Sequence, residues 1–130
     1  MQRLRAASPY LLAGVLTTTG ILHFARPEMY DGLIPSWLPG SARAWVLASG
    51  VAELACAAGL YAPRTRRPAA TATAALFVVV FPGNIEMAVH PGDVPRWLAL
   101  ARLPLQVPLI LWALQVRRDS AAAASAGVAR

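Results

Sequence analysis

Six polar side chains lie inside, or at the ends of, long apolar segments of the chain. They are His23, Glu53, Asn84, Glu86, Arg102 and Gln106. A guanidinium can hold an oxyanion, and carboxyl and imidazole groups can exchange protons, which is what quinone or proton chemistry requires. We expect Glu53, Asn84 and Arg102 to form the centre of such a site, with the other three around it. The pattern predicts a ligand site and assigns no catalytic residue.

The cost of burying these groups in lipid predicts that they meet one another. A charged side chain at the centre of a membrane-spanning helix costs roughly 2.5–3.5 kcal/mol on insertion scales, so pairing is expected. Arg102 has two candidate acceptors, Glu53 and Glu86. Three interpretations follow: an ion pair that fixes the register of the helices, a ligand or redox-linked proton site, and a transport path.

Other chemistries find little support in the sequence. No metal site is predicted, because His23 and His90 lie on separate elements without the close spacing of metal ligands. Cys56 is the single cysteine, so neither a disulfide within the chain nor a dithiol redox pair can form. The chain contains no glycine-rich phosphate loop and no nucleophile elbow. Enzymatic activity of this chain on its own is therefore not expected.

The elements that position the polar residues follow from composition and hydropathy. Hydrophobic residues make up 57% of the 130 residues and charged residues only 14%, and the apolar residues form long blocks. A helix needs about 20 mostly apolar residues to cross a bilayer. We therefore predict an all-α integral membrane protein, with a four-helix bundle in residues 1–118. Its transmembrane helices are expected at about 9–25, 43–62, 69–88 and 97–116.

The segments outside these helices also carry signals. Residues 26–42 contain three prolines and two glycines and predict a loop, whose apolar residues favour the membrane surface or a position over the bundle. Pro82 predicts a kink near the outer end of the third helix. The first apolar block is interpreted as a retained anchor, because no Ala-x-Ala-like cleavage site follows it. Residues 119–130, rich in Ala and Ser, are expected to form a disordered cytoplasmic tail.

The arginines predict the orientation of the bundle. The chain has twelve Arg and no Lys, with a net charge of +6. Seven arginines flank the four predicted spans on one side: Arg3, Arg5, Arg64, Arg66, Arg67, Arg117 and Arg118. Because basic residues accumulate on the cytoplasmic side of membrane proteins, both termini are expected in the cytoplasm. Nucleic-acid binding is not expected, since the arginines lie in short clusters between apolar blocks.

Four stretches, taken in order, resemble the DoxX-like family of small bacterial membrane proteins. They are GILHFARPEMYDGLIPSWLP, SGVAELACAAGLYAPRTRRPAA, FPGNIEMAVH and ARLPLQVPLILWA, and the similarity spans about residues 14–114. The resemblance implies a four-helix bundle in the bacterial inner (plasma) membrane. Some relatives in that family are subunits of a thiosulfate:quinone oxidoreductase. Others are linked to membrane-associated oxidoreductase or oxidative-stress assemblies.

Together, the polar site and the resemblance predict a subunit or accessory factor of a quinone-linked membrane redox assembly. No cofactor is evident in the sequence itself, and quinone is the ligand that this prediction favours. The expected partners are the lipid bilayer, a redox protein and a second copy of the chain in a homodimer. The alternatives are a structural or assembly protein of the membrane without a ligand and a small transporter.

Overall fold

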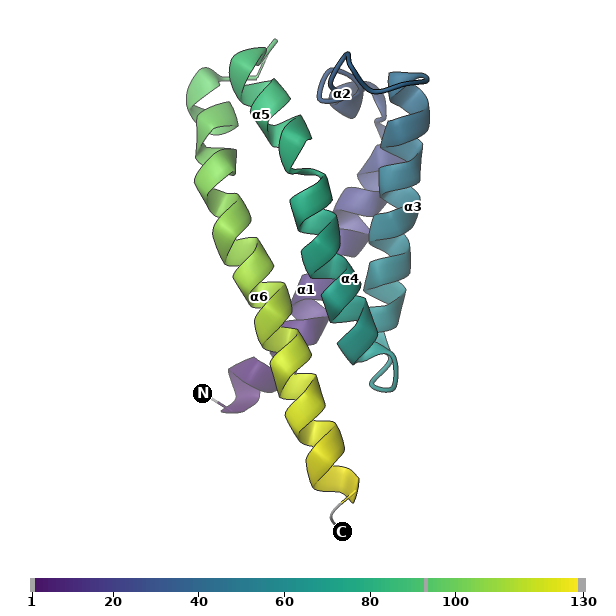
Figure 1. Ribbon diagram of the computed structural model, residues 1–130, viewed down its shortest axis with the longest axis vertical. Coiled ribbons are helices and arrows are strands. Elements are labelled where there is room, and N and C mark those ends of the chain that lie inside the picture. The colour runs from purple at the N-terminus through teal and green to yellow at the C-terminus, as the bar shows by residue number, and fades with distance from the viewer. Residues whose placement is uncertain (1, 93, 129–130) are drawn as a thin grey trace.

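All regular secondary structure in the part of the chain that the structure describes is helical. The computed structural model describes residues 2–92 and 94–128. These residues form six helices (Figure 1): α1 (Gln2–Ala25), α2 (Glu28–Asp31), α3 (Ala42–Tyr61), α4 (Arg66–Val79), α5 (Phe81–Val89) and α6 (Arg96–Val128). The predicted all-α class is confirmed. The predicted loop at 26–42 contains one short helix, α2.

Among the described residues, three helical stretches are long and apolar enough to cross a membrane. They are Ala42–Tyr61, Arg66–Val89 and Arg96–Ser125, the second of which joins α4 and α5. They correspond to three of the four predicted spans. Helix α1 is 24 residues long, but three consecutive threonines and His23 lower its hydropathy. A membrane crossing by α1 therefore stays a prediction.

The long helices pack as two pairs. Helix α1 packs chiefly on α3, helix α4 packs chiefly on α6, and contacts between α3 and α4 join the pairs. Buried apolar side chains fill the half of the bundle around α4, among them Leu12, Leu16, Leu60, Phe77 and Val116. These side chains come from α1, α3, α4 and α6, so the core joins the two pairs.

Pro82 divides the third predicted span into two helices, as the sequence indicates. Helix α4 ends at Val79, α5 begins at Phe81, and Val80 lies between them. Proline has no N–H to continue the helical hydrogen bonds and its ring disfavours the preceding turn. Below the break α4 packs on both α3 and α6, whereas above it α5 packs chiefly on α6. The two helix pairs therefore diverge above the break, as the ribbon shows (Figure 1).

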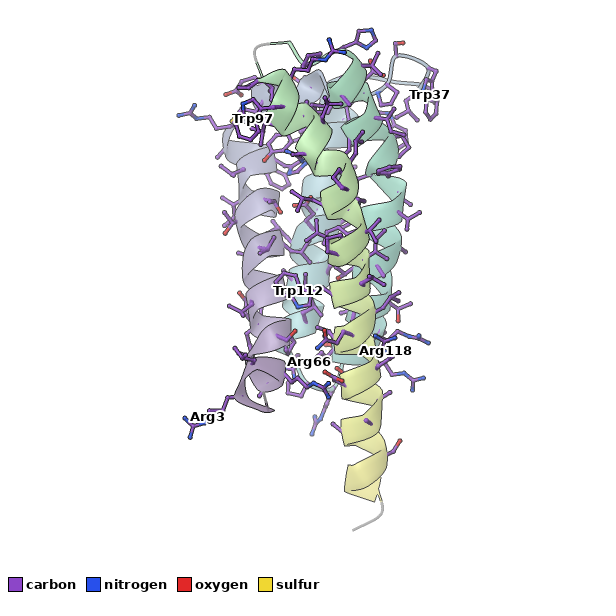
Figure 2. All side chains as sticks on the ribbon, turned by 90° about the vertical axis from the view of Figure 1, so that its left-hand side faces the viewer. Arg3, Trp37, Arg66, Trp97, Trp112 and Arg118 are labelled. Atoms are coloured by element: carbon purple, nitrogen blue, oxygen red, sulfur yellow. The ribbon has the colours of Figure 1, made fainter. Side chains whose placement is uncertain are left out.

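The two ends of the bundle differ in composition. Figure 2 shows Arg3, Arg66 and Arg118 near one end and Trp37 and Trp97 at the other. All five side chains except Arg66 are exposed, and Arg66 is half-buried. The ends are thus a basic end and a tryptophan-bearing end, which is the distribution that the positive-inside rule and the aromatic belts describe.

The helices extend further than predicted at both ends of the chain. Helix α6 continues to Val128, so residues 119–128 are helical and the expected disordered tail is not observed there. Ala is the strongest helix former, so an Ala-rich extension of an existing helix needs no new nucleus. The last two residues of the predicted tail, 129–130, lie outside the described residues. Helix α1 begins at Gln2 rather than near Pro9.

Candidate functional site

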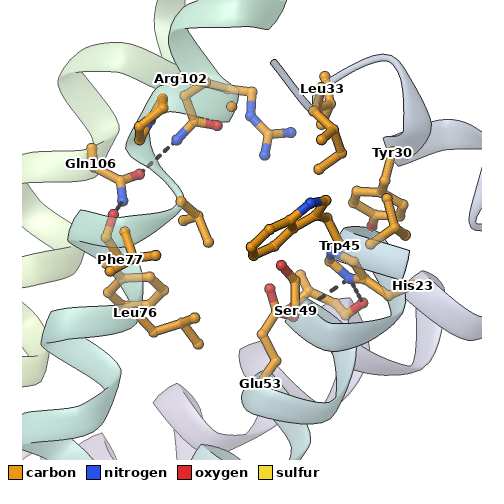
Figure 3. A pocket seen from close by; sticks show the side chains of 18 of the residues that line it. His23, Tyr30, Leu33, Trp45, Ser49, Glu53, Leu76, Phe77, Arg102 and Gln106 are labelled. Atoms are coloured by element: carbon orange, nitrogen blue, oxygen red, sulfur yellow. Dashed lines mark hydrogen bonds and ion pairs between the residues drawn. The ribbon is translucent and has the colours of Figure 1, made fainter. Parts of the chain in front are cut away.

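A cavity of about 510 Å³ lies beside the break between α4 and α5, and residues on both sides of the break line it. Side chains of α1, α3, α4, α5 and α6 and of the loop 26–41 line it. Five of the six residues predicted to form the polar site line this cavity: His23, Glu53, Asn84, Arg102 and Gln106. Figure 3 shows His23 and Glu53 on one wall and Arg102 and Gln106 on the facing wall. The folded chain therefore gathers most of the predicted site.

His23 lies in the last turns of α1 and is buried, with 8% of its surface exposed. Its Nδ1 lies 2.8 Å from the backbone oxygen of Thr19 and 3.8 Å from Oε2 of Glu53. A carbonyl oxygen can only accept, so the contact with Thr19 requires the hydrogen on Nδ1. The other ring nitrogen, Nε2, is then the acceptor when the imidazole is neutral.

The ring of His23 is also held in place by an aromatic neighbour. It stacks on the ring of Tyr30, with centroids 3.9 Å apart and an interplanar angle of 20°. Burial raises the pKa of Tyr30 above its ordinary value of 10.0; the charge of Glu53 adds to this effect and that of Arg102 opposes it. The Tyr30 hydroxyl therefore stays protonated at neutral pH and can donate a hydrogen bond.

Glu53 has an oxygen without a partner. Its side chain is only 13% exposed, and Oε2 accepts no hydrogen bond within the described part of the chain. A buried polar atom in this state costs free energy, and such atoms are uncommon in native proteins. The lone oxygen lies beside the cavity, so a ligand or a proton there would satisfy it.

Two glycines bring the His23 and Glu53 side chains together. A Cβ at Gly50 would lie 2.8 Å from both Cβ of His23 and Cε2 of Phe24. A Cβ at Gly20 would lie 2.9 Å from Cγ of Leu54. Both distances are too short for real side chains, so a side chain at either position would force a shift. At Gly50 the obstructing atoms include Cβ of His23, which can move only with α1, so the close approach of α1 and α3 requires glycine there.

The facing wall contains a chain of amide hydrogen bonds. Asn84 donates from Nδ2 to Oε1 of Gln106 at 2.9 Å, and Gln106 donates from Nε2 to the backbone oxygen of Phe77. The Phe77 carbonyl is one of the last of α4, whose terminal carbonyls lack helical partners. Gln106 therefore provides a hydrogen-bond donor for the Phe77 carbonyl at the helix break. It also fixes the position of Asn84 beside the cavity.

Arg102 lies one turn before Gln106 on the same face of α6, with its guanidinium toward the cavity (Figure 3). The predicted ion pair is not observed, because the ion pairs of the described residues join Arg102 to neither Glu53 nor Glu86. Glu86 does not line the cavity and instead lies 2.9 Å from Nδ1 of His90. Two residues along a helix turn about 200°, so Glu86 and Asn84 lie on opposite faces of α5.

The loop 26–41 contributes residues that the sequence analysis did not include in the site. Tyr30, Leu33, Trp37 and Leu38 line the cavity. A Cβ at Gly83 would lie 3.0 Å from the backbone oxygen of Leu33, so the loop reaches across to α5. The many apolar and aromatic residues of this loop are the feature of the sequence that could have placed it at the cavity, because such side chains are expected to pack against an apolar surface.

Two side chains at the start of α3 hold the loop, and one of them also lines the cavity. Arg43 donates to Asp31 through Nη2 and Nε, at 2.6 Å to Oδ2 and 3.1 Å to Oδ1. Trp45 donates from Nε1 to the backbone oxygen of Pro39 at 2.8 Å. Trp45 and Ser49 also line the cavity, two turns and one turn before Glu53, respectively.

The arrangement defines what chemistry the site can perform. One wall offers a cation and an amide, the other an imidazole, a carboxylate with a free oxygen and a phenol, and the surfaces between them are largely apolar. Hydrogen-bond donors on two facing walls fit a flat ligand with polar atoms at both edges. No group of three His, Cys, Asp or Glu side chains within the described residues comes together as a metal site.

Glu53→Gln tests whether the carboxylate serves a ligand or the fold. We expect the unfolding temperature of the protein in detergent to stay the same or to rise, because the substitution keeps the size of the side chain and removes a buried carboxylate oxygen without a partner. Glu28→Gln, at an exposed position of α2, is the matched control. If the unfolding temperature falls by about 5 °C or more in Glu53→Gln and not in Glu28→Gln, the carboxylate stabilises the fold as a partner of His23.

Residues 12–117 match the model of a family described as Domain of unknown function (DUF8561). No curated protein matches the chain. No solved structure matches it either.

Proposed function

The chain belongs to the DUF8561 family, and we propose that it is an integral membrane protein that binds a quinone-type ligand as a subunit or accessory factor of a membrane redox assembly. One observation carries this proposal: a cavity of about 510 Å³ has Arg102 on one wall and the His23–Glu53 pair on the facing wall. Ligand cavities typically have volumes of about 300–1,000 Å³ and mostly apolar linings with a few polar groups.

The proposed placement is a bacterial inner membrane crossed four times, by α1, α3, α4 with α5, and α6. The three apolar stretches and the length of α1 support this number of spans. Seven arginines belong to the basic end, which we assign to the cytoplasm together with both termini. Asp93 follows α5 in the sequence and would lower the net positive charge of the opposite end. It lies outside the described residues. The resemblance to the DoxX-like family supports the same placement and stays a prediction.

A quinone fits the chemistry of the two walls. It takes up two electrons and two protons at oxygens on opposite edges of one flat ring. Arg102 can stabilise negative charge on one oxygen, and the Asn84–Gln106 pair keeps a polar surface beside it. On the other wall, the Tyr30 hydroxyl is a donor, the Nδ1 hydrogen of His23 is held by the Thr19 carbonyl, and Oε2 of Glu53, which accepts no hydrogen bond, can take or return a proton. The electrons would come from a redox protein partner.

Titration of the purified protein tests the proposal. The protein in mild detergent is titrated with a benzoquinone that carries a decyl tail, and quenching of tryptophan fluorescence is followed, since Trp37 and Trp45 line the cavity. We expect saturable binding with a micromolar dissociation constant. Mass spectrometry of proteins that co-purify should identify a redox partner. Linear, non-saturating quenching, equal to that in a denatured sample, together with no redox partner, would overturn the proposal.

A further inference from the structure

A second hollow lies at the basic end of the bundle, far along the helices from the cavity described above. Its volume is about 310 Å³, and it is bounded by the first turns of α1, the start of α4 and the extended part of α6. Arg5, Arg66, Asp119 and Ser120 provide its polar surface, while Pro9 and Val116 provide apolar surface. We call this hollow the basic groove.

Arg66 is held in a fixed position at the basic groove. Its Nε donates to the backbone oxygen of Leu60 at 2.9 Å and its Nη2 to that of Tyr61 at 3.3 Å. Its guanidinium carbon lies 4.9 Å from the centre of the Tyr10 ring. These contacts order the side chain without neutralising it, because carbonyl oxygens and an aromatic face carry no net charge. An anion would therefore meet an already oriented cation.

The charge of the basic groove is not balanced within the described residues. The ion pairs of that part of the chain include neither Arg5 nor Arg66. Asp119 is the one carboxylate that borders the groove, so two guanidinium groups face a single negative charge. Further arginines of the basic end, Arg64, Arg67, Arg117 and Arg118, add to the positive potential. One more negative charge would balance the groove.

We propose that the basic groove binds the phosphodiester headgroup of an anionic phospholipid. Arg5 and Arg66 would contact the phosphate, while Pro9 and Val116 border the glycerol end. Basic pockets between membrane helices on the cytoplasmic side are sites of this kind. The inference rests on the membrane placement proposed above and is independent of the ligand in the cavity, so quinone binding and lipid binding can fail separately.

Native mass spectrometry of the full chain with added lipids tests this site. Phosphatidylglycerol is compared with phosphatidylcholine, which carries the same phosphodiester and an added positive charge, and with inorganic phosphate. We expect phosphatidylglycerol to be retained and the other two to bind weakly. Arg5→Gln should weaken retention about fivefold, the value that corresponds to one basic residue at a charged membrane surface. Arg66→Lys should also weaken it, because Lys cannot keep both backbone contacts and the position over Tyr10.

Arg64→Gln is the matched control, since it removes one exposed charge from the same end of the bundle without altering the groove lining. It should retain phosphatidylglycerol as the unmodified protein does. Equal retention of the two lipids, or an equal loss in Arg64→Gln and Arg5→Gln, would overturn the proposal in favour of diffuse attraction. Binding of inorganic phosphate as strong as that of phosphatidylglycerol would overturn the assignment to a lipid.

Discussion

Arg102→Gln is expected to weaken binding of the decyl-tailed benzoquinone by roughly 10- to 100-fold, because a hydrogen bond to a charged group contributes about 1.5–3 kcal/mol. The fold should tolerate the change, since no ion pair or side-chain hydrogen bond within the described residues joins Arg102 to the rest of the chain. The dissociation constant from fluorescence quenching and the unfolding temperature are measured on the same preparations.

Arg96→Gln provides the control for net charge. Arg96 is exposed at the start of the same helix and does not line the cavity. Its substitution should leave quinone affinity unchanged, and Arg102→Lys should fall between the unmodified protein and Arg102→Gln, because a point charge remains without the planar fork. If quinone affinity is unchanged in Arg102→Gln, Arg102 does not contact the bound quinone. An equal loss in Arg96→Gln would show a general effect of charge.

Gly50→Ala should destabilise the protein and its ligand site together. The new Cβ would lie 2.8 Å from atoms of His23 and Phe24, so α1 and α3 must separate at the level where His23 meets Glu53. Overpacking of this kind costs about 1–3 kcal/mol. We expect a lower unfolding temperature and, because the His23 wall moves, weaker quinone binding.

Gly14→Ala is the matched change on α1. No atom lies within 4 Å of the Cβ that it would add. Alanine is favoured over glycine inside a helix by about 0.5–1 kcal/mol, so this variant should be as stable as the unmodified protein or more so. Equal unfolding temperatures for Gly50→Ala and Gly14→Ala would contradict the close approach of α1 and α3.

Much of the architecture follows from local features of the sequence. Long apolar blocks predict α3, α4 with α5, and α6 because backbone groups in an apolar environment must be satisfied within the helix. The break at Pro82 follows from its missing N–H, and in the structure the break lies at Val80, two residues before Pro82. The meeting of His23, Glu53, Asn84, Arg102 and Gln106 at one cavity follows from the cost of isolating polar groups in an apolar bundle.

Which polar side chains contact one another depends on how each helix is rotated about its own axis, and the sequence does not reveal this rotation. The Pro82 break sets which face of α5 meets the cavity, and it brings Asn84 rather than Glu86 to that face. Gln106 bonds the Phe77 carbonyl because the break leaves that carbonyl free, a contact between residues far apart in the chain. The loop position depends on the Arg43–Asp31 pair, which joins the short helix α2 to the start of α3. These contacts arise only after the helices pack.

Photolabelling with an azide-bearing benzoquinone tests most directly whether the cavity between the two polar walls is the ligand site. The protein is irradiated with the probe in lipid nanodiscs and digested, and the labelled peptides are sequenced. We expect labels within 15–53 and 76–84 and at Arg102, Gln106 or Leu109 of α6, where the cavity-lining residues lie, and their loss when unlabelled quinone is in excess. Labels confined to exposed positions of α6 that do not line the cavity, such as Val107 and Leu111, unaffected by competing quinone, would contradict the account.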